Sequence, residues 1–297
     1  MTSPTLVRLY DVRSADGTVL RAWTNDADGP TVIMSNGLGT NPFAWPSLLD
    51  PDCGVRVIGW YHRGVGGSER PASGRIDMDA HIEDIVAVMD DAGVESAVVA
   101  GWSIGVNIAF ELATREPDRV TGILATGGVP GATFSTMLAP LRVPPLAAHH
   151  LMSNVSRLGQ LVGPGIAPLW TQVPWTPLMV KMVQATRFIS PDADPQVMRT
   201  LLTEFFRTDP AWFARLASAA SRHARVSLSS IDVPTTFIAA SGDILAGSAA
   251  MRSAAERIPG ARFLEVRGSH FIAAEHPEVV LEELKALLER VEGQPVG

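Results

Sequence analysis

Residues 97–114 read AVVAGWSIGVNIAFELAT. The first five are small or β-branched, as in a buried strand, and residues 104–114 place apolar side chains in a helical pattern. Between them, residues 101–105 (GWSIG) set a glycine two positions before and two positions after Ser103. A strand that turns sharply into a helix strains the serine backbone, and the glycines let the turn close without side-chain clashes. The stretch therefore predicts a hydroxyl group at the carboxyl end of a strand, beside a helix amino terminus.

The alternation of strand and helix extends to both sides of this stretch. The predicted strands cover residues 31–35, 55–60, 97–101, 120–125, 233–240 and 261–266, a hairpin joins 5–12 to 19–24, and the predicted helices cover 79–93, 104–114, 248–257 and 277–291. Strands separated by helices of this length favour right-handed crossovers. The pattern predicts an α/β protein with a mostly parallel sheet.

The middle of the chain departs from this alternation. From residue 127 to about 231 the sequence shows short helical patterns and many prolines, but no strand followed by a helix. We therefore expect a core domain of residues 1–129 and 231–297, with a helical insertion at 130–230. Prolines and glycines are expected to interrupt its long uncharged stretches, which argues against an integral membrane span.

Composition excludes several classes of protein. The 297 residues include 24 Lys and Arg against 31 Asp and Glu, a net charge of −7, and no basic cluster that would bind nucleic acid. A hydrophobic content of 46% argues against disorder, and one cysteine, Cys53, excludes a disulfide scaffold. No secretory signal is visible at the amino terminus, so we expect a cytoplasmic protein. Residues 119–190 contain five basic and no acidic side chains, so the rest of the chain carries a net charge of −12.

Five short motifs, in chain order, resemble those of the α/β-hydrolase family. They are SNGLG (35–39) after the strand at 31–35, HRGVGGS (62–68) after the next strand, GWSIG (101–105), SGD (241–243) after the insertion, and GSHF (268–271) after the last strand. The resemblance implies an eight-stranded, mostly parallel sheet with helices on both faces. It also implies that the insertion after the sixth strand forms a helical cap.

The family order of Ser, Asp and His assigns catalytic roles to Ser103, Asp243 and His270. A serine hydroxyl needs an adjacent base to become a nucleophile, and imidazole suits that role near neutral pH. A carboxylate then fixes the tautomer of the imidazole. Residues 127–128 are both glycine, so the alternative acid position of the family is empty, and Asp232 precedes its strand. Asp243 remains as the acid.

The other site residues follow from the same resemblance. Among seven histidines, only His270 lies in the loop after the last strand, since His276 directly precedes the closing helix. His62 replaces the family's usual Asp and is expected to be structural, while His81 is expected on the surface. The backbone N–H groups of Leu38 and Ile104 are expected to form the oxyanion hole. The residues expected to contact substrate are Asn36, Trp102, Trp170, Trp175, Met179 and Phe271. Those expected to pack in the core are Phe205, Phe206, Trp212 and Phe213.

These features predict a serine hydrolase that cleaves a carboxylic ester of a hydrophobic or aromatic small molecule through an acyl-enzyme. Alternatives are a C–C bond hydrolase of aromatic ring-cleavage products, a cofactor-free haloperoxidase or perhydrolase, and a catalytically silent ligand-binding protein of the same fold. Ser103 argues against relatives with an Asp nucleophile, the haloalkane dehalogenases and epoxide hydrolases. We expect no metal and no cofactor, since neither metal-ligand spacing nor a phosphate-binding glycine motif is present. A homo-oligomer is left open.

Overall fold

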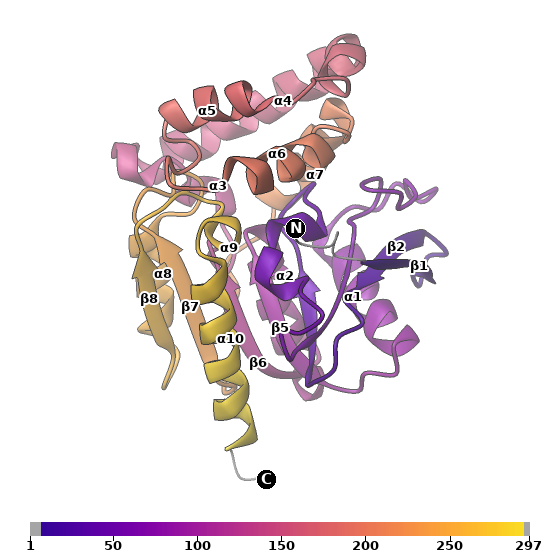
Figure 1. The fold of residues 1–297 in the computed structure, drawn as a ribbon, viewed down its shortest axis with the longest axis vertical. Helices are drawn as coiled ribbons and strands as arrows, with labels where there is room; N and C mark the ends of the chain where they lie inside the picture. Colours follow the sequence, from indigo (N-terminus) through magenta and orange to yellow (C-terminus); the bar gives the residue numbers. More distant parts are fainter. Residues whose placement is uncertain (1–6, 294–297) are drawn as a thin grey trace.

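The computed structural model describes residues 7–293 and contains one eight-stranded sheet (Figure 1). The strands are β1 (Arg8–Arg13), β2 (Val19–Thr24), β3 (Thr31–Ser35), β4 (Arg56–Trp60), β5 (Ala97–Trp102), β6 (Val120–Thr126), β7 (Thr235–Ala240) and β8 (Arg262–Val266). Their order is β1-β2-β4-β3-β5-β6-β7-β8. The pairs β1–β2 and β2–β4 are antiparallel and the others are parallel, which confirms the predicted sheet.

Helices cover both faces of the sheet. The helices are α1 (Met78–Asp91), α2 (Ile104–Arg115), α3 (Thr133–Thr136), α4 (Pro145–Trp170), α5 (Pro177–Ala185), α6 (Pro195–Phe205), α7 (Pro210–Ser221), α8 (Ser248–Ala255), α9 (Ile272–Glu275) and α10 (Pro277–Glu292), with short turns η1 (Pro42–Ala44), η2 (Pro46–Leu48), η3 (Pro117–Arg119) and η4 (Ala139–Leu141). Side chains alternate along β5, so Val98 packs with the α10 side of the core and Val99 with the side of α1, α2 and α8. Two apolar layers therefore hold the central strand.

The helices α3 to α7, hereafter the cap helices, lie between β6 and β7 in the chain and above one end of the sheet (Figure 1). They contact the loops that follow β3 and β4. The Nδ2 of Asn41 donates to the carbonyl of Leu201 at 3.1 Å, and the indole N–H of Trp212 donates to the carbonyl of Arg63 at 2.8 Å. Trp212 is buried, as predicted. These contacts place the cap helices over the carboxyl ends of the parallel strands.

The helix α4 corrects one expectation from the sequence. We expected prolines to interrupt the uncharged stretch near residue 158, but α4 runs for 26 residues and contains both Pro164 and Pro168. Proline removes one helical hydrogen bond, and both of these prolines are exposed, so water can reach the freed carbonyl groups. Extensive packing of α4 on α7 supports the helix from the other side. Within residues 7–293, no helix is long and apolar enough to cross a membrane.

A buried polar cluster joins the loop after β4 to α1. The guanidinium group of Arg63, fully buried, forms salt bridges with Asp84 at 2.8 Å and Asp16 at 2.6 Å. His62 and His81 lie beside it with ring centroids 5.1 Å apart. The expectation that His81 lies on the surface is wrong, because the inner face of α1 buries it to 4% exposure. The sequence motif at 62–68 therefore holds the end of β4 against α1.

The two buried histidines predict a loss of stability in acid. Burial, and to a smaller extent nearby positive charge, lowers the pKa of His62 to about 3 and that of His81 to about 4. In the unfolded chain both histidines have a pKa of about 6.5, so below that pH the unfolded state binds more protons than the folded state. As the pH decreases below this value, the free energy of unfolding should therefore decrease. The decrease is about 1.4 kcal/mol per pH unit for each histidine that stays neutral in the folded state.

Urea titrations between pH 7 and 5 measure this slope. His81→Leu should lower the slope of unfolding free energy against pH by the contribution of one buried histidine. His150→Leu, at an exposed position on α4, should leave this slope unchanged. Equal slopes for wild type and His81→Leu would contradict the assignment of acid sensitivity to this cluster.

Candidate active site

Ser103 occupies the turn between β5 and α2 in a strained conformation. Its φ is 56° and its ψ is −116°, and it is the residue immediately before the first turn of α2. Its N–H donates to the carbonyl of Thr126 at 3.1 Å. A non-glycine residue at positive φ costs free energy, and such strain gathers at functional sites. The hydroxyl group is thus held at the end of the central strand by a backbone that the fold over-determines.

The glycines around Ser103 are required by close packing. A Cβ at Gly101 would lie 2.6 Å from the carbonyl oxygen of Gly105, and a Cβ at Gly105 would overlap the carbonyl oxygen of Ser35. The first turn of α2 therefore rests directly on the end of β3. The predicted reason for the two glycines is confirmed by these contacts.

Replacing Gly105 with alanine should push α2 away from β3. Because the clashing atoms belong to the backbone, we expect the free energy of unfolding to fall by about 3 kcal/mol. Gly165→Ala is the matched control: a Cβ there meets nothing within 4 Å, and alanine in a helix should stabilise by about 0.5–1 kcal/mol. Urea denaturation of both variants checks this, and similar stabilities for the two would contradict the close approach.

Asp243 and His270 follow the last two strands, β7 and β8, and the parallel pairing of these strands brings the two side chains together. The Nδ1 of His270 lies 2.8 Å from the Oδ2 of Asp243, and the carboxylate is fully buried. The other carboxylate oxygen accepts the N–H groups of Leu245 at 2.8 Å and Ala246 at 2.9 Å. The carboxylate is therefore oriented before it meets the imidazole, and it selects the tautomer with the proton on Nδ1.

Trp102 connects this pair to the turn that carries Ser103. Its indole N–H donates to the carbonyl of His270 at 2.9 Å, and the two ring centroids lie 5.6 Å apart. Trp102 is buried and also packs edge-on against Trp45. It therefore positions His270 beside the strand end, while the predicted contact of Trp102 with substrate stays a prediction. Across residues 7–293, no hydrogen bond is made by the Ser103 hydroxyl group.

The two backbone donors predicted for an oxyanion lie on adjoining segments. Ile104 begins α2, so its N–H has no acceptor within the helix. Leu38 follows Gly37, where a Cβ would lie 3.1 Å from the ring of Trp102, so its loop packs on the same turn. Within the described part of the chain, the Leu38 N–H also lacks a backbone acceptor. Both amides can therefore donate to a ligand.

Asn36 lies buried at the end of β3. Its side-chain oxygen accepts the indole N–H of Trp45 at 2.7 Å, whereas its Nδ2, among the described residues, has no hydrogen-bond partner. A buried amide donor without a partner is costly. This group is thus free to donate to a further acceptor, and the contact of Asn36 with substrate stays a prediction.

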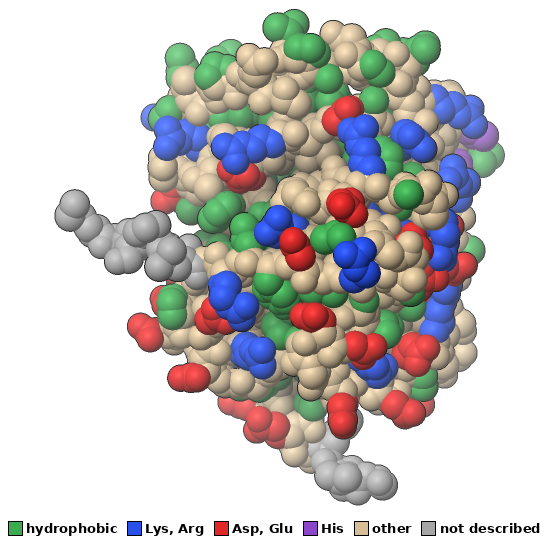
Figure 2. Space-filling model, turned by 90° about the vertical axis from the view of Figure 1, so that its right-hand side faces the viewer, with side chains coloured by type: hydrophobic (Ala, Val, Ile, Leu, Met, Phe, Trp, Pro, Cys, Tyr) green, Lys and Arg blue, Asp and Glu red, His purple; other side chains and the backbone are tan. Residues whose placement is uncertain are grey.

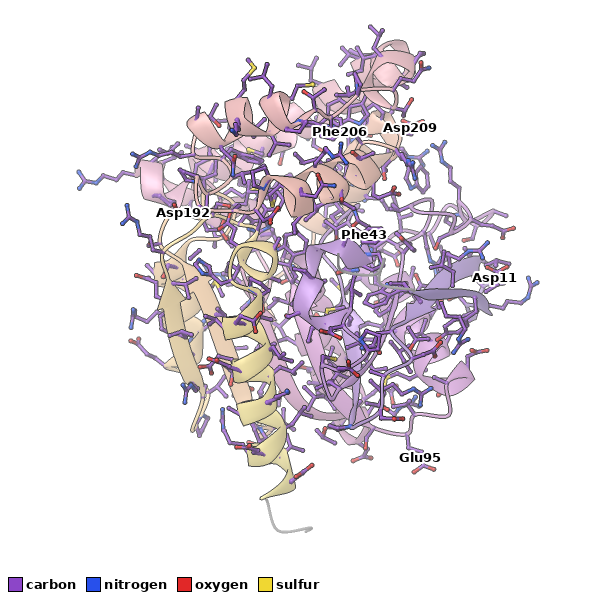
Figure 3. The ribbon with its side chains drawn as sticks, in the orientation of Figure 1. Asp11, Phe43, Glu95, Asp192, Phe206 and Asp209 are labelled. Carbon is purple, nitrogen blue, oxygen red and sulfur yellow. The ribbon has the colours of Figure 1, made fainter. Side chains whose placement is uncertain are left out.

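The cap helices gather aromatic rings over this edge of the sheet. Trp170 stacks on Phe206 with centroids 4.2 Å apart, and Trp175 meets the same ring at 4.7 Å. Figure 3 shows Phe206 on the cap helices and Phe43 on the core below them. Met179 is half-buried on α5. The structure therefore brings the two predicted tryptophans together, around a phenylalanine that we expected in the core.

Two further residues near the site were missed from the sequence. The rings of Phe213 and Phe205 lie 2.8 Å and 3.3 Å from the Cβ position at Gly39, directly after Leu38. Both rings are half-buried. On the other side, Phe271 packs on Phe188 with centroids 5.9 Å apart. The helical spacing of Phe205 and Phe213 predicted that both side chains face the interior. It did not predict their contact with the loop of Leu38 and Gly39, because that contact depends on how the cap helices fold over the core.

Comparison with known proteins defines the class. The family model described as alpha/beta hydrolase fold matches residues 30–277, which is most of the chain. The protein belongs to this family, as the motifs predicted.

Relatives and solved structures agree with this placement. RutD of Azorhizobium caulinodans, assigned by its name to carbamate hydrolysis, is 29% identical over 86% of this chain and 90% of its own. The 2-hydroxymuconate semialdehyde hydrolase of Pseudomonas sp. CF600 is 34% identical, over 36% of this chain and 38% of that protein. The enol-lactonase of Burkholderia xenovorans LB400 superposes with a TM-score of 0.72 at 21% identity, covering 94% of this chain and all of that one. A thermophilic esterase of Thermogutta terrifontis gives 0.73 at 18% identity, covering 96% and 99%. This chain is therefore a member of a hydrolase family.

Proposed function

We propose that this protein is a serine hydrolase that cleaves a carboxylic ester of a hydrophobic or aromatic small molecule through an acyl-enzyme. One observation carries the proposal: a strained serine ends the central strand directly after Trp102, whose indole N–H donates to the carbonyl of His270 in a buried Asp243–His270 pair. Serine, histidine and aspartate in this fold order are the requirements of nucleophilic acyl transfer. Residues 130–230 act as the cap over this site, and Asp243 is the acid.

The proposed reaction begins with Ser103. Its oxygen forms a bond to the ester carbonyl carbon while its proton passes to Nε2 of His270, whose Nδ1 proton stays hydrogen-bonded to Asp243. His270 then gives the proton to the leaving alcohol as the carbon–oxygen bond breaks, which leaves the acyl-enzyme. Water then attacks the acyl carbon while its proton passes to His270. The bond from the acyl carbon to Ser103 breaks, the carboxylic acid product leaves, and Ser103 takes the proton back from His270. The carboxylate stabilises the imidazolium in both halves.

Negative charge on the carbonyl oxygen would be stabilised by the N–H groups of Leu38 and Ile104. Such donors are fixed before the reaction, so they cost no reorganisation as charge develops. Ile104 adds the favourable electrostatics of a helix amino terminus. The Nδ2 of Asn36, which has no hydrogen-bond partner among residues 7–293, would hold a polar atom of the substrate nearby.

The cap aromatics suggest a preference for apolar acyl groups. Trp170, Trp175 and Phe206 form one contacting set, and apolar rings with few polar groups suit a hydrophobic ligand. We expect kcat/KM for p-nitrophenyl esters to rise from acetate to octanoate or benzoate, by about tenfold for each 1.4 kcal/mol of added binding in the transition state. Initial rates across the series measure this. A flat or falling profile would refute acyl selection by the cap.

A C–C bond hydrolase is the second candidate, favoured by the likeness to 2-hydroxymuconate semialdehyde hydrolase. A ring-cleavage product added to the ester series separates the two: faster turnover of this compound than of every ester would favour C–C cleavage. Perhydrolysis, a silent binding role, a cytoplasmic location and the oligomeric state stay predictions from the sequence.

A further inference from the structure

The outer surface of the cap helices exposes many large apolar side chains. Of thirteen exposed large hydrophobic residues within 7–293, twelve lie between positions 141 and 188, and the other is Leu9 on β1. Their exposure reaches 79% for Leu161 and Leu169. We call these twelve the apolar face: Leu141, Leu146, Leu151, Val155, Leu158, Leu161, Val162, Ile166, Leu169, Leu178, Met182 and Phe188. Clusters of this kind on a protein surface mark interaction sites.

The apolar face follows one side of α4. Leu151, Val155, Leu158, Val162 and Leu169 recur at steps of four, three, four and seven residues, which places them in one row along the helix. All five are at least 43% exposed. A surface helix ordinarily buries such a row against its own protein. The row on α4 has no such cover.

A different side of α4, made of small residues, packs on the protein. Ala148, Ser156 and Gly163 are its buried positions. The Ser156 hydroxyl donates to the carbonyl of Ala214 on α7 at 2.7 Å, and a Cβ at Gly163 would lie 2.6 Å from the N of Ala211. Since small side chains already hold α4 to α7, the exposed leucines are not needed to keep the helix in place.

Positive charge borders the apolar face. Arg142, Arg157, Lys181 and Arg187 are all exposed, and residues 119–190 hold no acidic side chain. In the described part of the chain, none of these four cations forms a salt bridge with an acid. Figure 2 shows hydrophobic side chains along the upper edge, where the cap helices lie, and most acidic side chains toward the opposite end.

We propose that the apolar face docks onto an anionic phospholipid bilayer, with α4 and α5 lying in the plane of its interface. A helix with exposed leucines and flanking cations binds such an interface through apolar burial and attraction to anionic headgroups. A second copy of this chain fits less well, because a two-fold contact would bring the uncompensated cations of both copies together. A bilayer supplies the opposite charge, while the acidic remainder of the molecule points away from it.

Vesicle sedimentation of the full chain tests the proposal. Vesicles of equal parts phosphatidylglycerol and phosphatidylcholine should bind the wild type, and phosphatidylcholine alone should bind it at least tenfold more weakly. Leu158→Gln with Leu161→Gln removes two apolar side chains without changing charge and should lower the partition coefficient by about tenfold or more. Arg157→Gln with Lys181→Gln should lower it about tenfold. Leu9→Gln, on the edge strand β1 and outside the cap helices, is the control and should bind like the wild type.

Sedimentation velocity without lipid provides the second readout, and thermal unfolding confirms that each variant folds. We expect the same oligomeric state for the wild type and for the double leucine variant. Failure of the wild type to bind anionic vesicles would overturn the proposal. A wild-type dimer that becomes a monomer in the leucine variant would overturn it too, in favour of a contact between copies. Neither outcome bears on ester hydrolysis, which is measured separately.

Discussion

Ser103→Ala is expected to lower kcat for ester hydrolysis by about 10⁶-fold, because nothing replaces the atom that bonds to the carbonyl carbon. Loss of a member of a catalytic set costs almost as much as loss of the whole set. Binding of the ester should change little, because the change removes a single oxygen. Steady-state kinetics at saturating ester measures the loss.

Two variants distinguish a chemical role of Ser103 from a structural one. Ser96→Ala changes an exposed serine at the opposite end of the same strand and should retain full activity. Ser103→Gly should be as inactive as the alanine variant yet more stable by about 1 kcal/mol, because glycine tolerates a φ of 56°. Substantial activity in Ser103→Ala would show that another group attacks the ester.

Asp243→Asn should lower kcat by about 10⁴-fold while leaving the fold intact. The side-chain oxygen of asparagine can still accept the N–H groups of Leu245 and Ala246, which the carboxylate now holds. Its NH₂ group would then face Nδ1 of His270. That arrangement favours the tautomer with the proton on Nε2, which cannot accept the proton of Ser103.

The control for this change is Asp232→Asn, at an exposed position before the same strand. It should keep wild-type kinetics, and both variants should unfold at nearly the wild-type temperature. A loss of less than tenfold in Asp243→Asn would contradict the role of the carboxylate. An equal loss in Asp232→Asn would point to a general effect on the domain.

The sheet could be predicted because each strand is marked by its own short stretch of sequence. The strands at 31–35 and 120–125 are short apolar runs bounded by turns, and their ends shift by at most one residue in the structure. The pairing of Asp243 with His270 was predictable because parallel strands deliver their carboxyl ends to one edge of the sheet. Chain order alone was enough to bring these two side chains together.

The parts that the sequence did not reveal depend on tertiary contacts. α4 passes through Pro164 because α7 supports it, and no local rule contains that support. His81 is buried because α1 turns it toward His62. Phe205 and Phe213 reach the Leu38 loop only once the cap helices fold back over the core. In each case the deciding partner is remote in sequence.

Labelling with a fluorophosphonate probe tests the central claim most directly. The probe forms a bond between phosphorus and the attacking oxygen, fluoride leaves, and His270 takes the proton. Intact-mass and peptide mass spectrometry should find one adduct per chain, on Ser103, that is absent from Ser103→Ala and slowed strongly in His270→Gln. An adduct on another residue, or undiminished labelling of Ser103→Ala, would contradict the account.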